Sequence, residues 1–509
     1  MAGTTTRILE RLNSLPNDRL TGILRGVEKE SLRALTDGSL AHTPHPAALG
    51  SALTHPCITT DFSESQVELI TGVHGSAESC LQELTRIHQF VYRAMEDERL
   101  WVASMPCRLP PDTQIPIARY GTSNIGRAKS VYRVGIGHRY GRRMQTISGI
   151  HYNWSMPGLG TADYFALIRN FRRRVFLLIY LFGASPAVDA SFVADRPHSL
   201  QPLAEGTFGR LHATSLRMGH LGYQSNAQAA LAVSYNCLES YAASLHEAMV
   251  RPYPAYEAIG VQGDDGEYRQ LSTTLLQIEN EFYGTIRPKR VINKGERPLH
   301  ALRERGVEYI EVRCMDLDPF VPVGIAPSTA RFLDVFLLHC LLADSPPDTP
   351  DECAAMARNQ EAVSARGREP GLRLERDGRE VDLVEWGQEL LDEFVPIAAL
   401  LDARLGGTAH HEALELARAT LADPGKLPSA RVLAAMAAGF EGSHLDFVRS
   451  RSEATRQEVL ALGWSDADAA HYHALAEASR RAQAEVEASD LLSFEAFRQH
   501  YLSPLRLQP

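Results

Sequence analysis

The chain has 509 residues, of which 44% are hydrophobic and 22% are charged, and its formal net charge at pH 7 is −10. This composition is typical of a folded globular protein and excludes a disordered or fibrous chain. The acidic balance argues against a nucleic-acid-binding protein, because such proteins carry an excess of Lys and Arg. From the length we expect about two to four domains, or one large catalytic body with an appendage.

The N-terminal sequence and the cysteines predict a protein of the reducing cytoplasm. The first residues lack the basic start and apolar core of a secretory signal. The most apolar run, residues 175–184, is too short to span a bilayer of roughly 30 Å. The 7 cysteines include no C-x-x-C pair, so neither a disulfide framework nor a zinc knuckle is indicated.

Three segments have the pattern of strands. Residues 21–35, 145–156 and 307–316 alternate apolar and polar side chains over part of their length. Residues 78–97 and 162–182 have helical periodicity instead. Because strands and helices are interspersed without a regular βαβ rhythm, the sequence predicts an α+β fold with an antiparallel sheet.

The composition changes near residue 344, where a segment rich in Pro and Asp begins. Residues 383–505 are dominated by Ala, Leu, Glu and Arg, with apolar residues at helical spacing. We therefore expect residues 1–345 to form the catalytic domain and residues 346–509 to form a mainly helical subdomain packed on it. The tail contains no group of residues to which we assign chemistry.

Glu28 and Glu30 lie in the first predicted strand. Alternate residues of a strand share a face, so the two carboxylates project together. Neighbouring carboxylates repel each other unless cations, solvent or a raised pKa relieve the repulsion. This pattern fits a solvated strand face as well as a metal site.

Further polar groups occur in the next two segments. Glu68 lies between Val67 and Leu69, where a buried carboxylate is costly unless it is paired or bound to a metal. Asp61 fits a turn or a cap equally well. In the second predicted strand, parity places five residues on one face, and Gly149 leaves room there for a ligand to approach: Gln145, Ile147, Gly149, His151 and Asn153.

Glu311 and Arg313 share a face of the last predicted strand. The pair fits an ordinary salt-bridged strand, or a metal ligand beside an arginine whose planar fork suits phosphoryl oxygens. Several carboxylates with one histidine suit Mg²⁺ or Mn²⁺ better than zinc. Metal ions beside arginines are the arrangement expected for binding the phosphates of ATP.

The usual nucleotide-binding loops are missing from the sequence. There is no G-x-x-x-x-G-K-[ST] pattern, and the glycines of residues 135–141 have the wrong spacing for a dinucleotide loop. An ATP site is therefore expected on the sheet. A basic and aromatic set favours an anion site nearby: Tyr132, Arg217, Tyr223, Tyr283, Lys289 and Arg290.

Nine segments occur in an order that identifies a family. They are R-G-V-E-K-E, G-S-A-L-T-H-P-x-I-T-T-D-F, S-M-P-C, Y-G-T-S-N-I-G-R, M-Q-T-I-S-G-I-H-Y-N, Y-L-F-G-A-S-P-A, A-T-S-L-R, I-E-N-E-F-Y-x-x-I-R-P-K-R and Y-I-E-V-R-x-x-D-x-x-P-F. The chain closely resembles the proteobacterial-type glutamate–cysteine ligases, from about residue 20 to residue 345 and more loosely through the helical tail.

The resemblance implies a glutamine synthetase-like fold, with a curved antiparallel sheet forming a funnel. It implies a two-step reaction in which ATP phosphorylates the γ-carboxylate of glutamate and the amine of cysteine then displaces phosphate. It further implies Mg²⁺, with Mn²⁺ as an alternative, and ATP as co-substrate. Glutathione is the expected feedback inhibitor, and the protein is expected to be a monomer.

The roles of individual residues follow from the same resemblance. The metal ligands look like Glu28, Glu30, Asp61, Glu68, His151 and Glu311. The catalytic residues look like Arg313, which would bridge the γ-phosphate and the developing intermediate, and Glu68. The cysteine pocket looks like Tyr132, Gln145, Ile147, Arg217, Tyr223 and Tyr283, while Lys289 and Arg290 would assist with glutamate or nucleotide.

The sequence departs from the family pattern in two places, and three other functions are alternatives. The linker at residues 156–163 is shorter than in the best-known members, and residues 133–138 differ from the expected pattern, which affects the cysteine pocket. A sister ligase of the same fold would join glutamate to another amine. A binding or regulatory protein would have lost the carboxylates, and a metal-dependent phosphohydrolase would hydrolyse ATP without any amino acid. A bifunctional enzyme that also makes glutathione is disfavoured, because the chain ends in helices.

Overall fold

The computed structural model describes residues 2–222, 226–229, 231–293 and 295–503. Its centre is an antiparallel sheet with the strand order β2-β3-β1-β5-β10-β9, and a short seventh strand, β4, pairs with β1. The strands are β1 (Leu24–Ala34), β2 (Ile58–Thr60), β3 (Gln66–Ile70), β4 (Arg99–Leu100), β5 (Ile150–Ser155), β9 (Ile286–Lys289) and β10 (Tyr309–Met315).

The three predicted strands are confirmed as β1, β5 and β10, which lie side by side in the centre of the sheet. The two predicted helices are confirmed as α3 (Ala77–Ala94) and α5 (Thr161–Phe182). The start of the second strand was predicted wrongly. Residues 144–146 form a 3-10 turn, closed by the bond from the Ile147 amide to the Met144 carbonyl (3.4 Å), and β5 begins only at Ile150.

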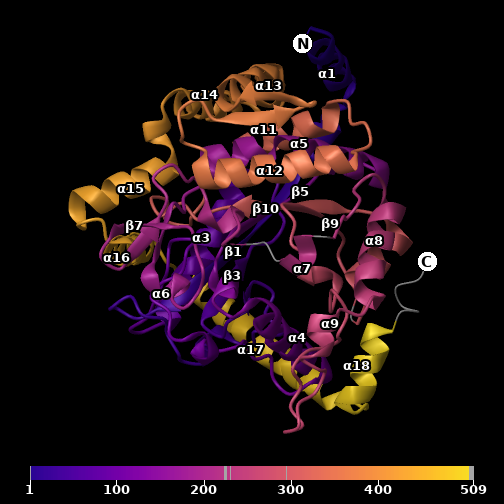
Figure 1. Ribbon diagram of the computed structural model, residues 1–509, viewed down its shortest axis with the longest axis vertical. Coiled ribbons are helices and arrows are strands. Elements are labelled where there is room, and N and C mark those ends of the chain that lie inside the picture. Colours follow the sequence, from indigo (N-terminus) through magenta and orange to yellow (C-terminus); the bar gives the residue numbers. More distant parts are fainter. Residues whose placement is uncertain (1, 223–225, 230, 294, 504–509) are drawn as a thin grey trace.

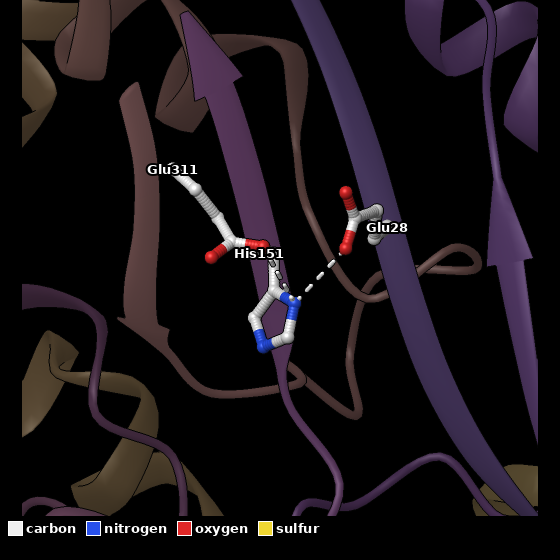
Figure 2. Close-up of side chains that lie close together, drawn as sticks. All are labelled: Glu28, His151 and Glu311. Atoms are coloured by element: carbon white, nitrogen blue, oxygen red, sulfur yellow. Dashed lines mark hydrogen bonds and ion pairs between the residues drawn. The ribbon is translucent and has the colours of Figure 1, made fainter. Parts of the chain in front are cut away.

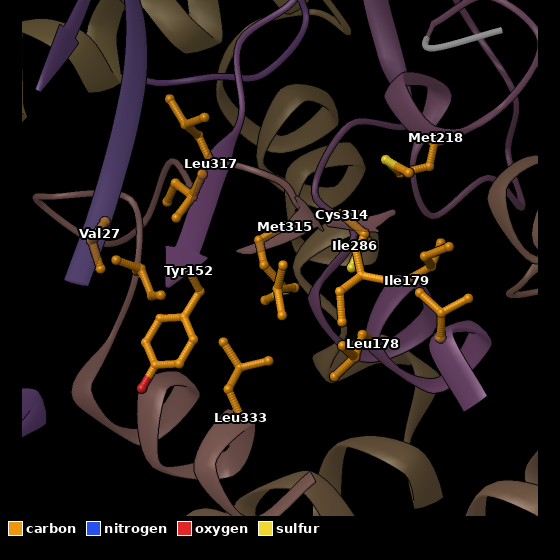
Figure 3. Packing of buried hydrophobic residues seen from close by; sticks show 14 of the residues in the cluster. Val27, Tyr152, Leu178, Ile179, Met218, Ile286, Cys314, Met315, Leu317 and Leu333 are labelled. Atoms are coloured by element: carbon orange, nitrogen blue, oxygen red, sulfur yellow. The ribbon is translucent and has the colours of Figure 1, made fainter. Parts of the chain in front are cut away.

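One face of the sheet is covered by α3, α5 and α11 (Pro327–Leu342). The apolar residues of β1 and β5 that alternate with polar ones turn toward these helices, and Val27, Tyr152 and Leu333 gather on this side (Figure 3). All three side chains are buried. Burial of apolar surface is the main favourable term in folding, so this face supplies most of the stability of the sheet.

Polar groups on the covered face are paired within it. Arg25 of β1 forms an ion pair with Asp334 of α11 (3.0 Å), and the Tyr152 hydroxyl donates to the same carboxylate (2.9 Å). Lys29 lies 2.8 Å from the Nε2 atom of His88 on α3, and burial lowers the pKa of Lys29 to about 7. The helices therefore fix the register of β1 through specific contacts as well as through packing.

Further helices surround this core (Figure 1). They are α1 (Ala2–Ser14), α2 (Asn17–Thr21), α4 (Asn124–Tyr140), α6 (Ala190–Val193), α7 (Asn226–Ala229), α8 (Leu238–Val250), α9 (Pro254–Glu257), α10 (Pro298–Arg305), α12 (Pro350–Arg366), α13 (Leu383–Leu405), α14 (Ala409–Ala422), α15 (Pro428–Gly439), α16 (His444–Ala461), α17 (Asp466–Ala488) and α18 (Phe494–Leu502). Two small sheets contain β6 (Ala187–Asp189), β7 (Gln201–Ala204) and β8 (Thr207–Gly209), and β11 (Arg373–Arg376) and β12 (Arg379–Asp382).

The C-terminal helices wrap around the sheet and its covering helices. At one end of the molecule α13 and α14 pack on α11, and α17 lies toward the opposite end, where it contacts α3 (Figure 1). Side chains join the two parts of the chain: the Gln89 amide donates to the Val459 carbonyl (3.1 Å), and the Ser51 amide donates to the Ser479 hydroxyl (2.9 Å). Among the described residues, no helix is long and apolar enough to cross a membrane.

The buried imidazole of His444 makes stability sensitive to acid. Burial lowers its pKa to about 4, so the unfolded chain takes up this proton first as the pH falls. Stability due to this group is therefore complete above about pH 6.5 and is lost toward pH 4. We expect His444→Phe to reduce the slope of the free energy of unfolding against pH by up to ~1.4 kcal/mol per pH unit. Unfolding measured by circular dichroism between pH 7 and pH 5 tests this, and an unchanged slope would contradict it.

Candidate active site

The uncovered face of the sheet gathers acidic residues from three strands and a histidine from a fourth. The antiparallel register sets Glu28 of β1 opposite His151 of β5, and Glu30 of β1 opposite Glu68 of β3. On the other side of β5, Glu311 of β10 is opposite Asn153. Because each of these residues has the same parity in its strand, all of them project from the same face. We call Glu28, Glu30, Glu68, His151 and Glu311 the acidic cluster.

His151 lies between Glu28 and Glu311 of the acidic cluster (Figure 2). Its Nδ1 atom is 3.2 Å from Glu28 and 3.8 Å from Glu311, and its Nε2 atom is 3.7 Å from Glu30. Donor atoms of Glu28, His151 and Glu311 lie within 4.8 Å of one another, as do those of Glu30, Glu68 and His151. The structure therefore brings together the five residues that were predicted from the sequence to lie on one face of the sheet.

Burial and crowding control the ionisation of the cluster. Burial, and next the nearby Asp61, raises the pKa of Glu30 to about 8. Burial also raises the pKa of Glu68 well above its ordinary value, and the charge of Glu28 adds to this effect. Burial opposes the ionisation of Glu311 too, but Lys289 and Arg313 hold its pKa well below its ordinary value. Repulsion between neighbouring carboxylates therefore disfavours the ionisation of all of them at once.

The donor set fits a hard divalent cation. Carboxylate oxygens with one imidazole are ligands that Mg²⁺ and Mn²⁺ accept. Burial, and next the charge of Arg313, lowers the pKa of His151, so that its ring is neutral at pH 7 and can offer a lone pair. The buried Nε2 atom of this ring has no hydrogen-bond partner in the described part of the chain. A cation would use that nitrogen and relieve the repulsion among the carboxylates.

Arg313 and Lys289 place positive charge at the edge of the cluster. The Arg313 guanidinium donates to Glu311 (3.0 Å) and lies 3.5 Å from the Nδ1 atom of His151. The Lys289 ammonium is 3.1 Å from the other oxygen of Glu311. Asn153, which follows His151 by two residues in β5, donates to Glu28 (2.8 Å). Asn153 was noted from the sequence only for its parity, and its bond orients a carboxylate of the cluster.

A cavity that we call the inner cavity adjoins the cluster on the side of Glu30 and Arg313. The Gln145 amide donates to the Tyr283 hydroxyl across it (2.8 Å). Asp61 reaches the wall of this cavity and is not part of either close donor group. Its walls are Glu30, Asp61, Phe62, Tyr132, Arg133, Ile136, Met144, Gln145, Ile147, Gly222, Asn280, Tyr283 and Arg313.

Several of these wall residues were not predicted from the sequence. Arg133 follows Tyr132 on α4, stacks over the Tyr120 ring at 4.6 Å and donates to the Asp61 carbonyl. Phe62, Met144 and Asn280 come from loops and 3-10 turns, whose direction no periodic pattern predicts. Arg133 directly follows Tyr132, which belongs to the basic and aromatic set, and this position in the sequence could have indicated that it lies at the cavity.

Arg217 is placed differently from the other predicted pocket residues. Its side chain is fully buried behind the inner cavity, where it donates to the Arg313 carbonyl (2.7 Å). Tyr223 lies outside the described residues. Tyr132, Gln145, Ile147 and Tyr283 do line the cavity, although Gln145 and Ile147 reach it from the 3-10 turn and the residue after it.

A second cavity, which we call the outer cavity, lies beyond Glu311. It has a volume of about 340 Å³, within the range of small-molecule pockets, and Asn280 belongs to both cavities. Lys289 and Arg290 form its charged side, and apolar residues of α8 and α10 form the other. The acidic cluster and Arg313 therefore lie between two cavities. A further cavity of about 550 Å³ shares Met144 with the inner cavity but is lined by no residue of the acidic cluster.

Comparison with known proteins decides the family. The family model described as Glutamate-cysteine ligase matches residues 9–363 of this chain. The glutamate–cysteine ligase of Pseudomonas paraeruginosa is 49% identical over 519 residues, covering 98% of this chain and 97% of that protein. The chain belongs to the glutamate–cysteine ligase family. The glutamate–cysteine ligase of Bordetella petrii is 48% identical, with 96% of each chain covered.

A solved structure of this ligase family has the same fold. The glutamate–cysteine ligase of Francisella tularensis, in complex with AMP, matches with a TM-score of 0.90 and 36% identity. The match covers 95% of this chain and 98% of that chain. The family resemblance, predicted from the sequence motifs, is thereby confirmed. The α+β fold with an antiparallel sheet, predicted from the interspersed strand and helix patterns, is confirmed as well.

Removing one carboxylate from the acidic cluster should weaken cation binding. We expect Glu28→Gln to reduce the affinity for Mn²⁺ by at least about ten-fold, because a neutral amide oxygen replaces a charged ligand. Isothermal titration of Mn²⁺ into the ligand-free protein measures this. Glu375→Gln, which changes an exposed carboxylate of β11, is the matched control. Equal affinities of Glu28→Gln and the wild-type protein would contradict the assignment.

Proposed function

We propose that this protein joins the γ-carboxylate of L-glutamate to the amine of L-cysteine, with conversion of ATP to ADP and phosphate. This is the first step of glutathione synthesis. The observation that carries the proposal is the acidic cluster with Arg313 at the junction of two cavities, in a chain of the glutamate–cysteine ligase family. Such a junction allows a nucleotide and an amino acid to approach one another over the residues that stabilise phosphoryl charge.

The chemistry proceeds in two steps. An oxygen of the glutamate γ-carboxylate attacks the γ-phosphorus of ATP, the bond to the bridging oxygen breaks, and ADP leaves. The cysteine amine then attacks the acyl phosphate carbon, the resulting tetrahedral intermediate loses a proton, and phosphate leaves with the electrons of its bond. Phosphate is a far better leaving group than the carboxylate oxygen, which is why activation is required.

Residues of the cluster have distinct parts in this proposal. Arg313 would donate to the transferring phosphoryl group and then to the oxyanion of the tetrahedral intermediate. Glu68, whose pKa burial raises, would accept the proton of the cysteine amine. The metal ligands would be Glu28, Glu30, Asp61, Glu68, His151 and Glu311. Bound Mg²⁺, or Mn²⁺ in its place, would neutralise phosphate charge.

The two cavities provide the binding sites in the proposal. Tyr132, Gln145, Ile147 and Tyr283 would hold cysteine in the inner cavity, with Tyr223 and the buried charge of Arg217 favouring its carboxylate. The outer cavity would hold the nucleotide. Its apolar residues Val291 and Ile292 are 65% and 47% exposed and would cover a base, with Lys289 and Arg290 beside the phosphates. The Francisella relative bound to AMP supports a nucleotide site in this fold.

We also propose a division of labour along the chain. Residues 1–345 would carry the chemistry, and residues 346–509 would form the supporting helical subdomain, in agreement with the position of every residue of the acidic cluster. A monomer in the reducing cytoplasm is proposed as well. Its seven cysteines are free thiols, and five of them are buried, which supports a reducing compartment.

Phosphate release is the direct test of the reaction. Wild-type protein with Mg²⁺ and ATP should release phosphate rapidly only when glutamate and cysteine are both present, and mass spectrometry should find γ-glutamylcysteine. Arg313→Ala should lower kcat by about a thousand-fold, because the loss of an arginine at the transferring phosphoryl group is typically that costly. Its melting temperature should remain close to the wild-type value, because Lys289 still compensates the Glu311 carboxylate in this variant.

Other results would assign the protein to another function. Release with glutamate and a different amine, but not with cysteine, would indicate a sister ligase. Release from ATP alone would indicate a phosphohydrolase. A folded protein that binds ATP without any turnover would be a binding or regulatory protein, and each of these outcomes contradicts the proposal.

Glutathione is proposed as a feedback inhibitor. It contains the glutamyl and cysteinyl groups of the product, so it should compete for the same two positions beside the acidic cluster. At millimolar glutathione we expect a higher KM for glutamate and an unchanged kcat at saturating glutamate. Steady-state rates at several glutathione concentrations measure this, and full activity at every concentration would contradict it.

A further inference from the structure

Asp316 is a buried carboxylate that the proposed reaction does not use. It directly follows the end of β10, three residues after Arg313, and its side chain is fully buried. A buried carboxylate is costly unless hydrogen bonds and an opposite charge compensate it. The groups that contact Asp316 therefore indicate its structural role.

Three donors from two distant segments converge on Asp316. The Ala184 amide and the Ser185 hydroxyl donate to its Oδ2 atom at 2.9 and 2.6 Å. The Ser215 hydroxyl donates to its Oδ1 atom at 3.1 Å. These donors belong to the sequence segments L-F-G-A-S and A-T-S-L-R, and Asp316 belongs to E-V-R-x-x-D. One carboxylate thus joins three of the segments that characterise the sequence.

Arg217 connects this carboxylate to the active site. Its Nη1 atom lies 3.7 Å from Asp316 Oδ1, and its Nη2 atom donates to the Arg313 carbonyl at 2.7 Å. The guanidinium passes directly over Gly149, where a Cβ atom would lie only 2.0 Å from Nη2. The Asp316 carboxylate therefore compensates the charge of this guanidinium, and the Arg313 carbonyl and the space left by Gly149 set its direction.

The Arg313 carbonyl that Arg217 binds belongs to a β-bulge. Val312 pairs with Tyr152 and Met315 pairs with Ile150, so Arg313 and Cys314 together oppose His151. A bulge breaks the regular ladder of hydrogen bonds and redirects the side chains at that point. Arg217 supplies a donor to the carbonyl at this irregular position. The direction of the Arg313 side chain toward Glu311 and His151 therefore depends on a contact made from behind the strand.

We propose that Asp316 is a positioning residue that acts through Arg217 to hold the bulge of β10 and thereby aim Arg313 at the reacting phosphoryl group. The inference rests on the proposed function in one respect, namely the role of Arg313. Among the described residues, Asp316 lines neither of the two cavities and belongs to neither donor group of the acidic cluster. Its carboxylate holds the guanidinium of Arg217, and that guanidinium holds the backbone of Arg313.

Asp316→Asn in the full-length protein tests the proposal, because it removes the charge and keeps the shape. We expect kcat to fall by at least about ten-fold, as a small displacement of a reacting group does. The KM values for ATP and glutamate should stay within about two-fold. The matched control is Asp334→Asn, which breaks the Arg25–Asp334 pair buried on the covered face of the same sheet. It should lower the melting temperature and leave kcat within about two-fold.

A double variant separates positioning from general support. If Asp316 acts through Arg217, Asp316→Asn should cause no further loss of kcat in an Arg217→Met background. The same coupling should appear in thermal unfolding, because Asp316→Asn removes a negative charge from beside a buried guanidinium only where Arg217 is present. Independent, additive losses in kcat and in unfolding would overturn the proposal, as would equal losses of kcat in Asp316→Asn and Asp334→Asn. The unfolding coupling does not require turnover, so a failure of the proposed function would show separately, in the wild-type assay.

Discussion

Repulsion among carboxylates is the constraint around which this structure is organised. Four glutamates from three strands surround one imidazole on a single face of the sheet, and burial raises the pKa of two of them. Such a face opposes folding by itself, because like charges and desolvation both disfavour the ionised state. The opposite face must therefore supply the stability, and it does so with a continuous apolar contact between the sheet and α3, α5 and α11.

The two faces are coupled because the central strands contribute side chains to both. In β1, Val27 and Lys29 turn toward the helices while Glu28 and Glu30 turn toward the acidic cluster. Packing on one face thus fixes the register that brings carboxylates into range on the other. A shift of one residue would move the glutamates into the apolar layer and the apolar residues to the site, which makes the register strongly determined.

The helical C-terminal part has no residue in the acidic cluster, yet it shapes the site. Helix α12 binds the loop that carries Arg217: the Gln360 amide donates to the Met218 carbonyl (3.0 Å), and the Thr214 hydroxyl donates to the Val363 carbonyl (2.8 Å). Arg217 is thus held by Asp316 on one side, while its loop is held by α12 on the other. Rigid support of this kind keeps charged groups in the geometry that catalysis requires.

The sequence by itself determined the family, the antiparallel sheet and the acidic cluster. Strand parity is a local property, so the shared faces of Glu28 and Glu30, and of Glu311 and Arg313, were readable from alternate residues. The ordered motifs fixed the family, which the comparisons confirm.

Only the tertiary structure decided how loops and turns complete the site. Gln145 and Ile147 reach the inner cavity through a 3-10 turn that strand parity did not predict, and Arg133 comes into the wall by the packing of α4. Arg217 is buried behind the cavity because a bulge in β10 presents a carbonyl to it and Asp316 compensates its charge. These placements depend on contacts between segments far apart in the chain, and no local periodicity encodes them.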